Sequence, residues 1–112
     1  MQSMNPEEIL LVLTNVPDRE TAMTIARALI DGRFAACVTV PAGATSVYRW
    51  QGAVESADET PLLIKTTCAR YPALEAELRR LHPYELPEII AVPLARGLPD
   101  YLQWVADETQ VA

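Results

Sequence analysis

The chain has 112 residues, half of them hydrophobic, which is enough for a single domain spanning residues 1–112 with a substantial core. Its net charge is −6 and its nine Lys and Arg residues are scattered, which excludes a nucleic-acid partner, and no apolar run reaches the roughly 20 residues that span a membrane. Residues 1–7 are polar, are predicted to be flexible and lack the basic start of a signal peptide, so we expect a soluble cytoplasmic protein.

The first third of the chain predicts a buried strand followed by an amphipathic helix. Residues 9–14 are continuously apolar, which is typical of a strand covered on both faces. Asp18 is a suitable N-cap for the next helix, and Gly32 stands where the C′ residue of that helix belongs. Between them, apolar residues recur at the spacing of one helical face: Ala22, Ile25, Ala26, Leu29 and Ile30.

The middle of the chain predicts a long, bent strand and a hairpin. Residues 36–40 and 44–50 favour strands, with a bulge or kink at residues 41–43 where a proline and a glycine interrupt the pattern. Gln51-Gly52 predicts the hairpin turn that follows. We interpret the charged residues 55–59 as a flexible, solvated tip.

The second half predicts a strand, a helix, a strand and a last short helix. Residues 61–67 favour a strand that begins at Pro61, and Pro72 is suited to the first turn of the next helix, whose inner face would carry Leu74, Leu78 and Leu81. Residues 88–94 have the β-branched pattern of a central strand, and residues 100–108 favour the last helix. The order β-α-β-β-α-β plus a C-terminal helix predicts an α+β protein with a ferredoxin-like arrangement.

The segment His82–Glu88 joins the second helix to the last strand and is predicted to be stiff. Pro83 and Pro87 each fix their own φ and push the preceding residue towards an extended conformation. The loop is therefore expected to hold His82, Tyr84 and Glu88 in a defined arrangement, as binding loops on rigid scaffolds do.

The predicted hairpin arm indicates that the protein is not a monomer. The arm formed by residues 38–50 and its returning partner is long for so small a sheet, and it places Tyr48 and Trp50 towards a free edge. Long apolar edges promote aggregation unless something covers them. Pairing with further copies of the chain covers such an edge, so we expect a closed homo-oligomer.

Several blocks of sequence together closely resemble the CutA family of divalent-cation tolerance proteins. The longest blocks are PAGATSVYRWQG at residues 41–52, LIKTT at 63–67 and HPYELPEI at 82–89, and residues 35–37 and 100–104 also fit. The resemblance implies a homotrimer of ferredoxin-like βαββαβ subunits whose hairpin arms pair across the interfaces. It also implies a role in tolerance to copper and other divalent cations.

The resemblance implies particular copper ligands, of which this chain keeps one. Copper-binding members carry a Cys at the end of the first strand and two adjacent His residues just before Pro-Tyr. Here these positions hold Thr14, Leu81 and His82. Thr and Leu do not replace the thiolate and imidazole ligands that copper prefers.

If a metal such as Cu²⁺ binds, the expected ligands are His82 first, then Glu88 and Cys37. The alternative role of His82 is structural, since it can hydrogen-bond the last carbonyls of the second helix. A lone imidazole without a second strong donor makes a weak site. Cys37 and Cys68 form no C-x-x-C pair, so we interpret them as small buried hydrophobic residues, with a metal or redox role as the alternative.

Five residues are candidates for a ligand cleft between subunits: Tyr48, Trp50, Lys65, Tyr84 and Trp104. Their aromatic rings are equally explained as apolar anchors of an interface, and Lys65 as one half of a buried ion pair with Glu59 or Glu88. An organic anion bound near Lys65 would make the protein a regulatory binding module, and a trimeric scaffold for a partner protein is a third hypothesis. No nucleophile–base pair and no glycine-rich phosphate loop is visible, so we expect neither catalysis nor an organic cofactor.

Overall fold

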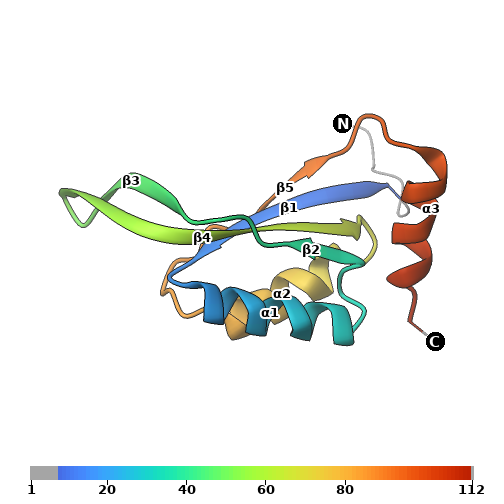
Figure 1. Ribbon diagram of the computed structural model, residues 1–112, viewed down its shortest axis with the longest axis horizontal. Helices are drawn as coiled ribbons and strands as arrows, with labels where there is room; N and C mark the ends of the chain where they lie inside the picture. The colour runs from blue at the N-terminus through green and yellow to red at the C-terminus, as the bar shows by residue number, and fades with distance from the viewer. Residues whose placement is uncertain (1–7, 112) are drawn as a thin grey trace.

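The computed structural model describes residues 8–111, which form a five-stranded antiparallel sheet and three helices (Figure 1). In chain order the elements are β1 (Ile9–Val16), α1 (Arg19–Asp31), β2 (Cys37–Thr39), β3 (Ala44–Trp50), β4 (Ala53–Thr67), α2 (Tyr71–Leu81), β5 (Ile90–Pro93) and α3 (Pro99–Glu108). The strands follow the order β2-β4-β1-β5, and β3 pairs with the first half of β4. The predicted α+β class and element order are confirmed. The predicted flexibility of residues 1–7 concerns residues outside those described.

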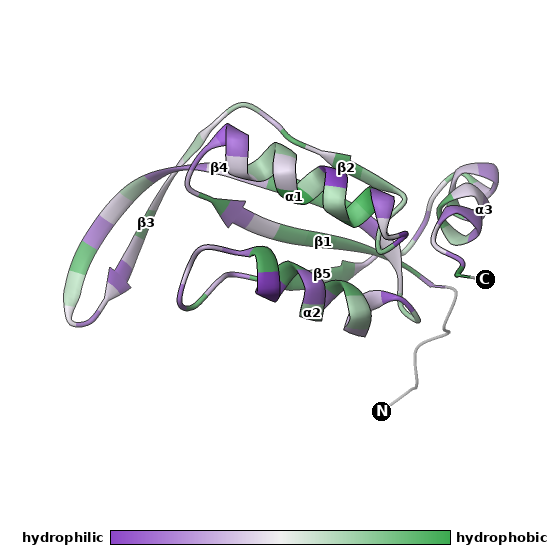
Figure 2. Ribbon diagram, turned by 90° about the horizontal axis from the view of Figure 1, so that it is seen from below, coloured by the Kyte–Doolittle hydropathy of each residue, from purple (hydrophilic) through white to green (hydrophobic). Residues whose placement is uncertain are grey.

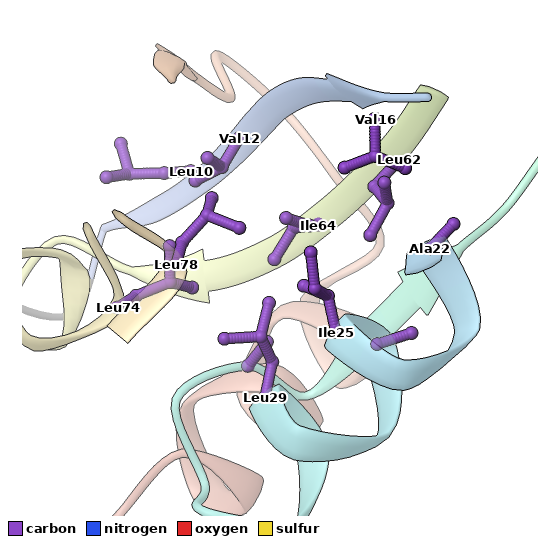
Figure 3. Packing of buried hydrophobic residues seen from close by; sticks show 12 residues of the cluster. Leu10, Val12, Val16, Ala22, Ile25, Leu29, Leu62, Ile64, Leu74 and Leu78 are labelled. Atoms are coloured by element: carbon purple, nitrogen blue, oxygen red, sulfur yellow. The ribbon is translucent and has the colours of Figure 1, made fainter. Parts of the chain in front are cut away.

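α1 and α2 cover the same face of the sheet and enclose the hydrophobic core (Figures 1 and 2). Alternate residues of β1 point towards these helices, so Leu10, Val12 and Val16 are buried. They lie in one cluster with Leu62 and Ile64 of β4 (Figure 3). The helices complete this cluster with Ala22, Ile25, Ala26 and Leu29 of α1 and Leu74 and Leu78 of α2. Within residues 8–111 no helix is long and apolar enough to cross a membrane.

The predicted start of α1 is confirmed, but its end differs from the prediction. Asp18 is the N-cap, and its Oδ1 accepts the backbone N–H of the first turn at 2.8 Å. At the other end Gly32 has φ −84°, and Arg33, with φ +57°, adopts the left-handed conformation instead. The guanidinium of Arg70 donates hydrogen bonds to the backbone carbonyls of both residues at 3.0 Å, so these carbonyls at the end of the helix have partners. Ile30, predicted on the buried face, is 39% exposed because it lies at the margin of that face.

Asp18 makes the stability of the fold depend on pH at the acidic end of the scale. The hydrogen bonds from Thr21 lower the pKa of this carboxyl below its usual value of 3.8. A lowered carboxyl pKa gives stability that is present above the unfolded pKa and is lost as the pH falls through the folded pKa. In Asp18→Asn an oxygen still accepts the hydrogen bond, but the side chain cannot ionise. We therefore expect the wild type to have the higher free energy of unfolding near neutral pH, and this difference to disappear as the pH falls below 3.8.

Urea unfolding midpoints of the two proteins between about pH 6 and pH 2 measure this difference. Glu20→Gln is the matched control, because it removes the same charge from the first turn of α1 without removing a cap. A difference between Asp18 and Asp18→Asn that stays constant over the whole pH range would contradict the expectation.

β3 and the first half of β4 form a two-stranded arm that projects beyond the helices (Figures 1 and 2). The predicted hairpin turn is confirmed, since Gln51 and Gly52 have φ values of +49° and +85°, both in the range of a type I′ turn. Residues 55–59 are not the predicted flexible tip, because each of them pairs with a residue of β3. Pro61 was predicted to begin a strand, but it lies inside β4. It is tolerated there because β4 pairs with β3 up to Glu59 and with β2 from Leu63 onwards, so that no strand pairs with Pro61 along this edge.

The face of the sheet opposite α1 and α2, here called the open face, is apolar. Leu11 and Leu13 of β1 point to this side, because the residues between them point to the core. Their register partners on the same face are Leu63 and Lys65 of β4 and Ile90 and Val92 of β5, so Lys65 is a charged residue among aliphatic ones. Ile90 and Val92 are each 48% exposed. Among the described strands β5 pairs only with β1, so it is an edge strand and the prediction of a central strand is wrong.

Candidate functional site

A pocket of about 740 Å³ opens between the arm and the proline loop, residues 82–88. We call it the arm–loop pocket. Strand residues two apart point the same way, and the register places four of its lining residues on one face of the arm: Tyr48, Trp50, Glu55 and Glu59. Facing them from the loop and from the end of β1 are Tyr84, Glu85, Leu86, Glu88 and Asn15.

His82 anchors the proline loop to β1. Its side chain is buried, and its Nε2 lies 2.8 Å from the carbonyl oxygen of Asn15. Its Nδ1 accepts the backbone N–H of Tyr84 at 3.2 Å, which assigns the proton of a neutral ring to Nε2. Burial lowers the pKa of His82 below its usual value and favours this neutral form. Both ring nitrogens are thus engaged within the fold.

His82 was predicted to hydrogen-bond the last carbonyls of α2 through its ring, and the structure shows a different arrangement. Its backbone N–H, and not its ring, bonds the Leu78 carbonyl at the end of α2. The ring reaches across to a strand because α2 ends beside the last residues of β1. A metal could reach Nδ1 only after the N–H of Tyr84 had left it.

Tyr84 and Glu59 close the inner wall of the pocket. The Tyr84 hydroxyl donates to Glu59 Oε2 at 2.8 Å, and its ring centre lies 4.9 Å from that of His82. Burial, followed by the hydrogen bond and charge of Glu59, raises the pKa of Tyr84 well above its ordinary value, so the phenol stays protonated. The hydroxyl therefore acts as a fixed hydrogen-bond donor to the Glu59 carboxylate.

Asn15 joins two of the predicted metal ligands. Its carbonyl oxygen bonds His82, and its side-chain Nδ2 donates to Glu88 Oε2 at 3.1 Å. The sequence analysis did not single out Asn15. Its signal is a polar side chain directly after the long apolar run of the first strand, on the face opposite to the core.

The structure brings together only part of the predicted metal set. His82 and Glu88 are each hydrogen-bonded to Asn15. Cys37 lies farther along the sheet: it pairs with Lys65 of β4, whereas Asn15 pairs with Pro61, and four strand residues span about 14 Å. Among residues 8–111 no three His, Cys, Asp or Glu side chains are grouped closely enough to hold a metal ion. The metal role of these three residues stays a prediction.

The predicted cleft residues also divide into two groups. Tyr48, Trp50 and Tyr84 line the arm–loop pocket, whereas Lys65 and Trp104 do not. Lys65 points to the open face and donates to the hydroxyl of Thr39 at 3.2 Å, so the predicted ion pair with Glu59 or Glu88 is wrong. The strand register explains why Lys65 does not reach either glutamate: it lies in the second half of β4, beyond the arm, where β4 pairs with β2.

The remaining predicted residues lie away from the pocket. Trp104 lies on α3 with its ring centre 5.6 Å from that of Tyr101. Cys37 and Cys68 are free thiols, and both are half-buried instead of fully buried as predicted. Cys68 packs against the core cluster, which agrees with its interpretation as a small hydrophobic residue.

The arm–loop pocket is strongly acidic. The described residues that line it include neither a Lys nor an Arg side chain, and they include four carboxylates: Glu55, Glu59, Glu85 and Glu88. Arg49 belongs to the arm but lies on its other face, since it is one residue away from both Tyr48 and Trp50. The electrostatic potential of such a pocket attracts cations and opposes the organic anion proposed from the sequence.

The copper ligands implied by the family resemblance do not fit this chain. Thr14 is 1% exposed on the core face of β1, and its Oγ1 has no hydrogen-bond partner among the described residues. Leu81 is apolar and packs against the core, and both ring nitrogens of His82 are engaged. A buried hydroxyl, an alkyl side chain and an occupied imidazole do not make a copper site.

Known proteins are similar to this chain in sequence and in fold. Residues 10–108 match the family described as CutA1 divalent ion tolerance protein. The chain is 48% identical over 99 residues to divalent-cation tolerance protein CutA of Thermus thermophilus, covering 88% of this chain and 96% of that protein. It is 39% identical over 105 residues to protein CutA of Mus musculus, covering 94% of this chain and 59% of the mouse protein. The crystal structure of CutA from Xylella fastidiosa superposes with a TM-score of 0.89 at 46% identity, covering 92% of this chain and 99% of that chain.

Proposed function

Because this chain belongs to the CutA1 divalent ion tolerance family, we propose that it serves divalent-cation tolerance by binding cations, without catalysis, as a cytoplasmic homotrimer. The observation that carries the proposal is the charge of the arm–loop pocket, which is lined by four carboxylates and, within residues 8–111, by no Lys or Arg side chain. Carboxylate oxygens are ligands for divalent cations, and a concave acidic surface raises the local concentration of such ions.

Glu88 is the foremost candidate ligand within this pocket. It stands on a loop stiffened by Pro83 and Pro87, and Asn15 orients its carboxylate through one oxygen. His82 contributes only if a metal displaces the N–H of Tyr84 from Nδ1. A set of ligands dominated by oxygen suits copper less than it suits harder divalent cations.

Calorimetric titration with Cu²⁺ and with Mn²⁺ tests this proposal. We expect Glu88→Gln to weaken cation binding about tenfold, because it removes the charge and one ligand oxygen while an amide still fills the site. We expect His82→Ala to change binding less than Glu88→Gln, since its ring is held by Asn15 and Tyr84.

Glu20→Gln is the control, because it removes the same charge from α1 and leaves the arm–loop pocket unchanged. Equal binding by the wild type and by Glu88→Gln would remove Glu88 from the site. If neither ion binds to the wild-type protein, the proposal that the protein acts by holding cations fails as a whole.

The proposed trimer is supported by apolar surface that the single chain leaves uncovered. The open face carries five aliphatic side chains, and two of them, Ile90 and Val92, are about half exposed. On the arm, Val47 is 72% and Val54 is 64% exposed. Surfaces of this kind mark contacts with other protein chains. Pairing of arms and packing of open faces in a closed ring would bury both regions.

A further inference from the structure

Lys65 places a positive charge among the aliphatic side chains of the open face. It is half-buried beside Leu63 of its own strand and opposite Leu11 of β1. Its ammonium group donates to the hydroxyl of Thr39 at 3.2 Å, and neither of the two ion pairs within residues 8–111 includes it. The proposed trimer buries the open face, and an ammonium ion that leaves water is unfavourable until an anion lies beside it. Lys65 therefore needs a carboxylate when the trimer forms.

Glu59 is a carboxylate in the corresponding situation. It is 8% exposed, and neither of the two ion pairs within residues 8–111 includes it. Its Oε2 accepts the hydroxyl of Tyr84, which is a neutral donor. The other three carboxylates that line the arm–loop pocket are exposed, so water solvates their charge. Among the four, Glu59 gains most from a positive charge placed against it, because burial has already removed most of its water.

Lys65 and Glu59 are too far apart to pair within one chain. They are six residues apart on β4, which is about 20 Å along a strand. Because the separation is even, both side chains leave the same side of this strand. In a closed ring of three subunits each contact joins two different surfaces, one from each neighbour. A trimer can therefore set Lys65 of one subunit against Glu59 of the next, with every subunit contributing once to each of its two contacts.

We propose that Lys65 of one subunit enters the arm–loop pocket of its neighbour and forms an ion pair with Glu59, so that three such pairs close the ring. The pocket has a volume of about 740 Å³ in the single chain, which leaves room for a side chain from outside. Its lining also includes Tyr48 and Tyr84, against which the alkyl stem of a lysine packs favourably. A buried ion pair of this kind fixes which surfaces meet, because any other packing leaves both charges without a partner.

Charge reversal tests the pair. Lys65→Glu and Glu59→Lys each set like charges against one another at all three contacts, and we expect either variant to raise the protein concentration at which half of the trimer dissociates at least about a hundredfold. The double variant restores opposite charges in reversed order, so its value should return to within about tenfold of the wild type. Analytical ultracentrifugation of a dilution series, in a urea concentration at which the chains stay folded, measures this dissociation. Arg27→Glu makes the same change of charge on the exposed side of α1 and should leave it unchanged.

A second set of variants avoids like charges and serves if circular dichroism shows that a reversed chain is unfolded. Lys65→Met and Glu59→Gln each remove one partner, and the glutamine still accepts the hydroxyl of Tyr84. We expect the double variant to dissociate no more readily than the more affected single variant, because the second substitution removes a charge that has already lost its partner. Effects that multiply, as those of independent sites do, would overturn the proposal.

Two further outcomes count against the pair. Folded Lys65→Glu protein that dissociates like the wild type would overturn it, as would a double reversal that dissociates like the single variants. Lys65→Glu combined with Glu55→Lys is the control for the choice of carboxylate, since Glu55 lines the same pocket, and recovery by this combination alone would show that Glu59 is not the partner.

This inference rests on the proposed trimer, and its failure is distinguishable from the failure of that proposal. A wild-type mass of 12.4 kDa would overturn both. A wild-type trimer in which the reversed pair brings no recovery would overturn the ion pair alone. Cation binding is tested separately by Glu88→Gln, because Glu88 is held on the proline loop by Asn15 and is not part of the proposed pair.

Discussion

Light scattering on a sizing column is expected to return about three times the 12.4 kDa mass of the chain at micromolar concentration. The physical reason is the apolar open face, where Leu11, Leu13 and Leu63 lie beside the exposed Ile90 and Val92. Burying this surface against other copies is favoured by the hydrophobic effect, and leaving it in water is not. A mass of 12.4 kDa would contradict the proposed trimer and leave the open face without an explanation.

A single substitution tests which surface makes the contact. Val92→Asp places a charge on the open face, where burial between subunits would be costly, so we expect the mass to fall towards that of one chain. Ile30→Asp is the matched control, since Ile30 is 39% exposed at the margin of the buried face of α1 and lies away from the open face, and the mass should stay that of the trimer. A folded Val92→Asp protein with the wild-type mass would exclude the open face from the interface.

Leu78→Ala is expected to lower the free energy of unfolding by about 2–5 kcal/mol. Leu78 is completely buried on the inner face of α2, in one cluster with residues of α1, β1 and β4. The truncation removes apolar atoms from a packed core and leaves a cavity that the surrounding helices and sheet fill only in part. Urea unfolding midpoints, compared at one fixed protein concentration, measure the loss.

Leu98→Ala makes the same chemical change at a side chain that is 70% exposed. We expect its effect to stay within about 0.5 kcal/mol, because most of the leucine is already in water. Similar losses from Leu78→Ala and Leu98→Ala would show that the cluster between α1, α2 and the sheet is not the main source of stability.

Local patterns in the sequence were enough to predict most of the secondary structure. Continuous apolar residues located β1, helical spacing located the buried side of α1, and Gln51-Gly52 located the turn of the arm. The errors arose where pairing decides the conformation. Residues 55–59 look like a solvated loop because they are charged, yet β3 lies beside them and makes them strand. β5 looks like a central strand because it is apolar, yet it lies at an edge.

The candidate site divides in the same way. The sequence predicted that the proline loop would hold His82, Tyr84 and Glu88 in place, and the hydrogen bonds show all three held. It did not predict Asn15 as the residue that joins His82 to Glu88, because the two partners follow it by 67 and 73 positions. It also grouped Lys65 with Trp50, although the register of β4 separates them.

By itself, the sequence determined the α+β class, the acidic character of the chain, the stiff proline loop and the resemblance to the CutA family. These properties depend on residue type and on spacing within one segment, which a linear sequence contains. The tertiary structure alone decided that both nitrogens of His82 are engaged, that Glu59 is buried and makes no ion pair within residues 8–111, and that four carboxylates line one pocket. The physical reason is that burial, hydrogen-bond partners and local charge depend on which distant segments meet, and spacing along the chain does not specify those meetings.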